Sequence, residues 1–202
     1  DLIGREYLKE SLTATPDNHN LSVFAEKISS LPLAFKPGIK WNYSVGIDIA
    51  GRLIEIISGE PLNVYIRKNL LDLLDMKDTQ FFLPKTKVDR FTDCFFYNEM
   101  QENFLPLVKQ YENFYYQKDK VTNFSGGSGL LSTGRDYLKF SSLLLNGGKY
   151  KNMRIFEDEV IRRIKVNALD RDIASIGVET FAQMPTTGMG HSLAGSVITN
   201  PY

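Results

Sequence analysis

The sequence predicts a predominantly α-helical chain with strand only near its C-terminal end. Apolar residues recur at helical spacing in successive segments, and glycine or proline punctuates the chain between them. A β-branched strand pattern begins only at Ser196, and Asn200 and Pro201 end it. We therefore expect helices to build the core, with a strand following them.

The first half of the chain contains helices that glycine and proline separate. The first covers residues 21–31 and ends at a segment with two prolines and a glycine. The next ends at Ser58, where Gly59 suits the left-handed C-terminal position, and another begins at Pro61, so these two should form an antiparallel pair. The positions expected to face the core are Leu21, Phe24, Ala25, Ile28 and Leu31, then Ile47, Ala50, Leu53, Ile54 and Ile57, then Leu62, Tyr65, Ile66, Leu70 and Leu73 or Leu74.

The second half is less regular. Residues 82–124 have no steady period, which predicts long loops with short strands or helical turns. Ser132 or Thr133 can cap a helix that runs to Asn146, and residues 156–166 predict another, with acidic residues first and basic residues later. The aromatic residues scattered through the irregular segment are Phe91, Phe95, Phe96, Tyr97, Tyr111, Phe114, Tyr115 and Tyr116.

Composition limits the class of function. The 202 residues are 43% hydrophobic, which allows a sizeable core. Lysine plus arginine total 24 and aspartate plus glutamate total 24, so the net charge is zero and no charge field indicates nucleic acid or an anionic membrane as partner. A small neutral or zwitterionic ligand fits this balance better.

Cysteine content and hydropathy leave the compartment open. Cys94 is the one cysteine, so no internal disulfide scaffold can form. No apolar run approaches the roughly 20 residues that span a bilayer. Bacterial periplasm and cytoplasm are both compatible with these features. The chain begins at Asp1 without a charged signal region or a Met, so we expect that its start has been cut.

Tyr43 is the candidate catalytic residue, and the pattern leaves two interpretations open. It lies just before a helix start, where a phenol can take a proton from a nucleophile. An aromatic residue at this spacing also suits a core or capping role. Its neighbour Ser44 can be a nucleophile, but no His or Lys stands at a helical spacing to activate it, which favours an N-cap.

Other chemistry-bearing residues give weaker signals. His19 lies in a polar loop and suits solvent, whereas His191 follows Gly188 and Gly190 and can belong to a site. Two histidines so far apart in sequence make a poor metal or relay argument, and we expect neither metal nor cofactor. The glycines of "SGGSGLLST" precede a helix without the Gly-Lys-Ser/Thr of a phosphate loop, which favours a backbone turn.

Three ordered blocks of the sequence are "FKPGIKWNYSVGIDIAGRLIEIISGEPLNVYIRKNLLDLLDMKDTQFF", "SGGSGLLSTGRDYLKFSSLLLNGG" and "GMGHSLAGSVITNPY". Together they resemble the serine β-lactamase-related superfamily, in its class C β-lactamase-like group with family VIII carboxylesterases and D-amino-acid peptidases. The resemblance implies acylation of a serine in Ser-x-x-Lys, with the lysine and a tyrosine handling the proton. No serine of these 202 residues has lysine three positions on, and no Lys/His-Thr-Gly occurs.

The resemblance implies roles for two residues. Tyr43 matches the family's catalytic tyrosine. Val45 stands at the substrate-binding position where lactamases and penicillin-binding proteins carry an amide-binding asparagine. Valine can neither donate nor accept that hydrogen bond, so ester hydrolysis or acyl transfer is favoured over lactam recognition. The implied substrate is therefore a small ester or amide.

The resemblance also implies an architecture. Residues 1–180 would be the mostly helical domain inserted in an α/β fold, and residues 181–202 the start of the returning sheet. The edge at 193–199 would then be exposed, or a second copy would cover it as a homo-oligomer. Such a piece, lacking the nucleophile, should be inactive alone. A non-enzymatic helical binding module remains the alternative, which the absence of an upstream Ser-x-x-Lys would favour, and a lactamase-like role despite Val45 is a third.

Overall fold

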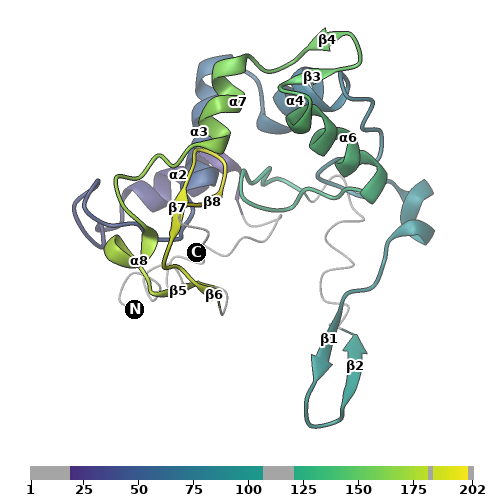
Figure 1. The fold of residues 1–202 in the computed structure, drawn as a ribbon. Helices are drawn as coiled ribbons and strands as arrows, with labels where there is room; N and C mark the ends of the chain where they lie inside the picture. Colours follow the sequence, from purple (N-terminus) through teal and green to yellow (C-terminus); the bar gives the residue numbers. More distant parts are fainter. Residues whose placement is uncertain (1–18, 107–120, 182–183, 200–202) are drawn as a thin grey trace. The chain divides into compact units, whose positions relative to one another are not determined.

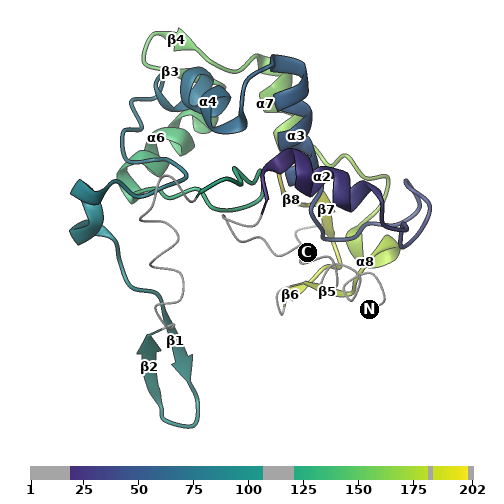
Figure 2. The same ribbon diagram turned by 180° about the vertical axis from the view of Figure 1, so that it is seen from behind.

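The computed structural model describes residues 19–106, 121–181 and 184–199. The described residues form two compact units, each discontinuous in sequence. The first unit comprises the described residues within 1–31, 46–72 and 77–133. The second unit comprises the described residues within 32–45, 73–76 and 134–202. Figures 1 and 2 show the elements from opposite sides. The expected division at 180/181 remains a prediction.

Helices open the first unit, as predicted. Asn20 caps the first of them, because its side-chain oxygen accepts from the backbone N–H of Val23 at 2.9 Å. Gly59 ends the second with φ of 71°, the left-handed conformation expected there. The Glu55 carboxylate then accepts from the N–H of Leu62 and satisfies a donor of the next helix. These elements are α2 (Leu21–Ser29), α3 (Gly46–Ser58) and α4 (Leu62–Ile66).

A π-helix, η1 (Arg67–Leu71), follows α4 where the sequence predicts a continuous α-helix. The N–H of Asp72 donates to the carbonyl of Arg67, five residues back, at 2.9 Å. The wider turn changes which side chains face inward, so Leu71 is buried although the periodicity selects Leu70. Leu62 is buried as expected.

The prediction of which face of α3 is buried is wrong. Ile47, Leu53 and Ile57 are exposed, Ile57 to 83%, whereas Gly51 is the buried residue of this helix. A Cβ on Gly51 would lie 2.9 Å from Leu62 Cδ2, so the missing side chain is what lets α3 pack there.

Residues 82–106 match the predicted mixture of loop, turn and short strand. Its elements are the 3-10 helix η2 (Lys85–Arg90) and the antiparallel strands β1 (Phe95–Asn98) and β2 (Asn103–Pro106). Gln80 and Leu131 form a separate antiparallel bridge through both backbone hydrogen bonds. The predictions for Tyr111, Phe114, Tyr115 and Tyr116 lie outside the described residues.

The second unit contains the two remaining predicted helices. The helix predicted up to Asn146 ends at Leu145, before Gly147 and Gly148. The later helix has acidic residues in its first turn and basic residues in its last, as expected. The elements up to this point are α6 (Gly134–Leu145), β3 (Lys149–Tyr150), β4 (Met153–Arg154) and α7 (Asp158–Lys165), with β3 and β4 paired antiparallel.

Short hairpins complete the second unit. After α8 (Ile173–Ile176), β5 (Thr180–Phe181) pairs with β6 (Met184–Pro185), and β7 (Met189–His191) pairs with β8 (Ser196–Ile198). The strand predicted from Ser196 is therefore present, and its predicted end at Asn200 and Pro201 lies outside the described residues. The prediction of a predominantly α chain is not confirmed, because four two-stranded sheets occur within the described ranges. No helix in these ranges is long and apolar enough to cross a membrane.

Candidate active site

Tyr43 lies on the surface of the second unit, in the loop that precedes α3. Its side chain is 69% exposed, so it is not a core residue. Its ring packs against Phe181 of β5, with ring centroids 4.9 Å apart and planes tilted by 44°. This contact supports one face of the ring and leaves the phenol accessible to a ligand.

Trp41 joins the same group of rings. Its ring contacts Phe181 edge-on at 6.0 Å and His191 at 5.9 Å between centroids. We call Trp41, Tyr43, Phe181 and His191 the aromatic cluster. The first two residues of this cluster come from one loop, and the other two follow some 140 to 150 positions later in the sequence. The sequence gives no spacing signal that would have joined them.

Hydrogen bonds link α8 and its N-cap residue to both chain segments that carry the aromatic cluster. The backbone N–H of Trp41 donates to the carbonyl of Ile176 at 2.9 Å. At the other end of the helix, the Asp172 carboxylate accepts from the N–H of Ser175 at 3.0 Å and from the N–H of Gly188, just before β7, at 3.1 Å. The Ser175 hydroxyl, followed by the Gly188 N–H, lowers the pKa of Asp172, so this carboxylate is ionised at neutral pH.

The sequence did not predict where His191 lies in the candidate site. Its backbone N–H donates to Asn167 Oδ1 at 2.8 Å, and its ring Nδ1 lies 2.6 Å from the carbonyl oxygen of Ser192. Because a carbonyl only accepts, Nδ1 carries the proton, and in the neutral ring Nε2 keeps its lone pair. The half-buried His191 therefore adds a group that can accept a proton beside Trp41.

Val45 and Ser44 follow Tyr43 in the same loop. Val45 is half-buried, and Ser44 is exposed and already engaged in an interaction of its own. The catalytic role of Tyr43 and the substrate-binding role of Val45 stay predictions at this point.

The glycine-rich turn at 125–129 has the geometry of a structural turn in the first unit. The buried Ser125 hydroxyl donates to the Asp48 carboxylate near the start of α3. It also accepts from the N–H groups of Gly127 at 3.1 Å and Ser128 at 2.9 Å. The serine oxygen thus occupies backbone donors that a phosphate loop would direct at its ligand, which supports the predicted turn role.

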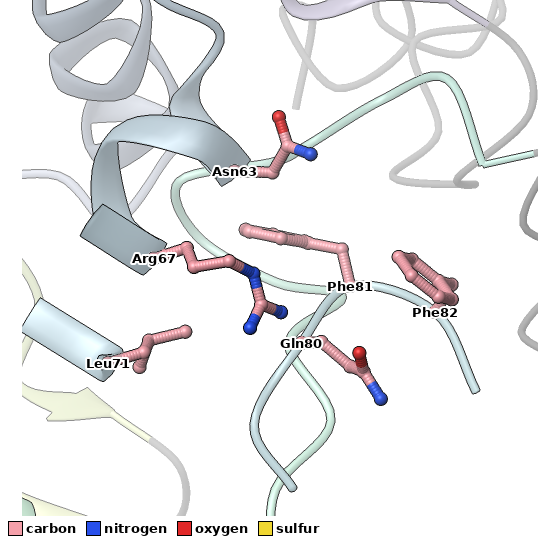
Figure 3. A pocket seen from close by; sticks show the side chains of 6 residues that line it. All are labelled: Asn63, Arg67, Leu71, Gln80, Phe81 and Phe82. Atoms are coloured by element: carbon pink, nitrogen blue, oxygen red, sulfur yellow. The ribbon is translucent and has the colours of Figure 1, made fainter. Parts of the chain in front are cut away.

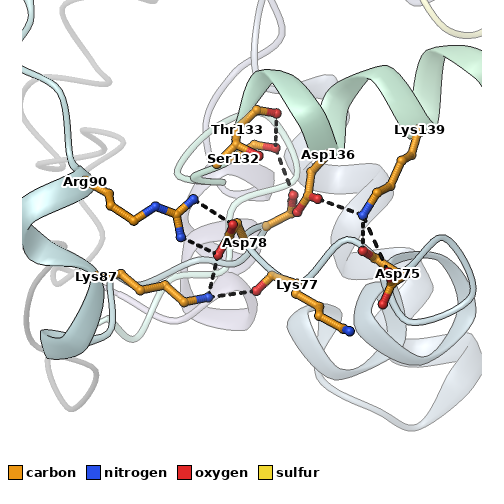
Figure 4. A network of polar contacts seen from close by, with 10 residues as sticks. Asp75, Lys77, Asp78, Lys87, Arg90, Ser132, Thr133, Asp136 and Lys139 are labelled. Atoms are coloured by element: carbon orange, nitrogen blue, oxygen red, sulfur yellow. Dashed lines mark hydrogen bonds and ion pairs between the residues drawn. The ribbon is translucent and has the colours of Figure 1, made fainter.

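Charged groups elsewhere in each unit are paired with one another (Figure 4). In the first unit, Asp78 accepts from Arg90 at 2.7 Å and from Lys87 at 2.6 Å, and these bonds hold the pKa of Asp78 well below its usual range. In the second, Lys139 pairs with the buried Asp136 at 3.1 Å. The Asp78 pairs tie a loop to η2, whereas Asp136 and Lys139 lie one turn apart on α6.

Metal-binding geometry is absent from the described ranges, where no group of three or more His, Cys, Asp or Glu side chains is placed to hold an ion. His19, expected in solvent, is half-buried, and its Nε2 lies 3.3 Å from Lys27 Nζ. Because the ammonium is a donor only, this nitrogen accepts from Lys27.

Comparison with known proteins finds relatives of this chain. It is 27% identical to Protein Rv1367c of Mycobacterium tuberculosis over 203 residues, which is 98% of this chain and 47% of that protein. It is 32% identical to lovastatin esterase of Penicillium rubens over 136 residues, or 67% of this chain and 33% of the esterase. The chain thus spans half or less of the length of these relatives.

The fold also matches a solved structure. EstCE1, described as a hydrolase with promiscuous acyltransferase activity, superimposes with a TM-score of 0.75 over 96% of this chain and 51% of EstCE1, at 18% identity. The profile of the Beta-lactamase family matches residues 4–166, which include Tyr43 and Val45. The chain therefore belongs to the Beta-lactamase family and has the serine β-lactamase-like fold of its esterase and penicillin-binding relatives.

Proposed function

We propose that this chain is part of a serine hydrolase that cleaves small esters through an acyl-serine intermediate. The observation that carries the proposal is the exposed phenol of Tyr43, whose ring packs against Phe181 in the aromatic cluster. We propose that Tyr43 has the role of the family's catalytic tyrosine. The name of lovastatin esterase among the relatives supports an ester as substrate. Amides remain within the proposed substrate class.

The chemistry assigns one proton transfer to Tyr43. A serine oxygen attacks the ester carbonyl carbon, and Tyr43 as a phenolate takes the serine proton on Oη as the new C–O bond forms. The proton then goes to the leaving alkoxide as the ester C–O bond breaks, which releases the alcohol. Water then cleaves the acyl-serine bond, which releases the acid and restores the serine hydroxyl. No Ser-x-x-Lys occurs in these 202 residues. We therefore propose that the chain alone is inactive and that the nucleophile lies elsewhere in the working enzyme.

Val45 is proposed to line the acyl side of the site. Its apolar side chain cannot hydrogen-bond a lactam or peptide amide, and a site without that partner gains little from an amide substrate. We extend the proposal to association through β8, since Ile198 of this strand and Leu193 of the turn before it are exposed. A second copy would cover these side chains.

Hydrolysis of p-nitrophenyl butyrate and nitrocefin by the intact protein tests the proposal. We expect ester turnover to exceed nitrocefin turnover, and Tyr43→Phe to lower kcat for the ester by about 100-fold or more, the scale of positioned proton transfer. Tyr137→Phe is the matched control, because Tyr137 is also exposed, to 62%, but lies on α6 outside the aromatic cluster. Equal kcat in both variants, or no turnover by a folded protein, would favour the binding-module alternative.

A further inference from the structure

A hollow of about 310 Å³ lies within the first unit, built entirely from that unit's residues. Its volume is at the lower end of the range of about 300–1,000 Å³ for small-molecule sites, so it suits a small ligand. Figure 3 shows the Arg67 guanidinium beside the Phe81 ring, while the Gln80 amide is directed away from the guanidinium. The lining residues are Asn63, Arg67, Leu71, Gln80, Phe81 and Phe82.

The π-helix η1 forms one wall of this hollow. Arg67 and Leu71 are its first and last residues, and both line the space. A π turn is rare and less favourable than a continued α-helix, and such turns occur frequently at functional sites. Here the turn buries Leu71 while the Arg67 side chain stays half-buried at the hollow. This backbone feature therefore points to the same place as the cavity.

The guanidinium of Arg67 is only loosely paired. Its carboxylate partner within the described residues is Asp72, with Nη1 and Oδ1 3.8 Å apart, beyond hydrogen-bonding distance. Arg90, in contrast, lies 2.7 Å from the Asp78 carboxylate, and Arg162 lies 2.6 Å from Glu159. Arg67 therefore keeps donors that an incoming anion can use.

Asn63 of α4, which also lines the hollow, adds an unsatisfied polar atom. Its Oδ1 is buried and has no hydrogen-bond partner among the described residues. Most buried side-chain oxygens in folded proteins are hydrogen-bonded, and leaving one unpaired is costly. An unpaired acceptor, a loosely paired cation and an apolar ring thus line one small space.

We propose that this hollow is an additional binding site for small carboxylates that carry a planar apolar group. The carboxylate binds the fork of N–H donors of Arg67. The planar group packs against Phe81 and Leu71. Asn63 Oδ1 accepts from a donor on the ligand where one is present. This site is not required for the hydrolase chemistry, so the two proposals can fail independently.

Isothermal titration of the intact protein with benzoate and benzamide tests the site without any turnover. The two probes have nearly the same shape, and only benzoate has a negative charge. We expect saturable binding of benzoate and at least tenfold weaker binding of benzamide. Arg67→Met should weaken benzoate binding at least tenfold, whereas Lys68→Met should change it by less than twofold. Lys68 is the adjacent cation, pairs with Glu60 at 3.0 Å and does not line the hollow.

Gln80→Glu is the second variant, and it keeps the proposal testable if Arg67→Met does not fold. It preserves side-chain shape and adds a negative charge to the hollow, so benzoate binding should fall by a similar factor. The proposal is overturned if benzoate does not bind saturably, if benzamide binds equally well, or if benzoate binding survives unchanged in the folded variants of Arg67 and Gln80.

Discussion

Replacing Gly177 by alanine should push the Trp41 backbone away from helix α8 and disturb the aromatic cluster. A Cβ at Gly177 would lie 2.7 Å from the carbonyl oxygen of Trp41 and 3.2 Å from both Trp41 Cε3 and the carbonyl oxygen of Ile173. The first of these contacts is closer than real Cβ atoms come to other atoms. Trp41 cannot simply retreat, because its N–H is bonded to the carbonyl of Ile176, the residue before Gly177.

The size of the effect follows from overpacking. Forcing an extra methyl into a packed contact costs about 1–3 kcal/mol of unfolding free energy. The reduced entropy of the unfolded chain with alanine offsets about 0.4–1 kcal/mol of this cost. A net loss of about 1–2 kcal/mol lowers Tm by roughly 2–8 °C for a chain of this size.

Calorimetry, tryptophan fluorescence and ester hydrolysis should all report the change. Trp41 is the single tryptophan of the 202 residues, so its emission reports the aromatic cluster within this chain. Gly195→Ala is the matched control in the same unit, since no atom lies within 4 Å of its added Cβ. Equal Tm and equal emission in the two variants would refute the argument that Gly177 is needed for the approach of Trp41.

Two further predictions concern the first unit. Arg90 and Lys87 lower the pKa of Asp78 on folding, so its stabilising contribution is present above the unfolded pKa of about 3.9 and is lost as the pH falls below it. In urea unfolding, Asp78→Asn should lower the unfolding free energy by up to about 1 kcal/mol at neutral pH. The difference in unfolding free energy between the native sequence and the variant should shrink in acid, and a difference that does not depend on pH would contradict this. Ser125→Ala removes the donor to Asp48 and the acceptor for two backbone N–H groups, so it should lower the unfolding free energy by about 1–3 kcal/mol, and an unchanged urea midpoint would exclude that role.

The sequence predicts the helix ends at Ser58 and Leu145 well, because local chemistry decides them. Gly59 takes the left-handed conformation that its position after Ser58 predicts. The helix after Thr133 likewise stops at Leu145, before the glycine pair. These outcomes depend on residues adjacent in sequence, so tertiary packing has little opportunity to override them.

The candidate site was predictable only in part, because its residues meet through tertiary structure. Tyr43 could be selected by resemblance to a family motif, but nothing in the sequence indicates that its ring lies against Phe181. The contact of His191 with Trp41 likewise depends on α8, which no prediction included. The π turn at Arg67 escaped prediction because the apolar residues around it fit a regular α-helical stripe equally well.

Helix α3 shows why an apolar pattern does not by itself select the buried face. Apolar side chains occur around much of this helix, so several faces satisfy the helical period. The choice depends on Gly51, where the absent side chain admits Leu62 and Leu21 to close contact. It depends also on Gly126, since a Cβ there would collide with the carbonyl of Ile47. Glycine carries no hydrophobic signal, yet at these two positions it sets how closely the turn at 125–129 and α4 approach α3. A substitution at either glycine should therefore change the packing of α3 more than the loss of one exposed isoleucine would.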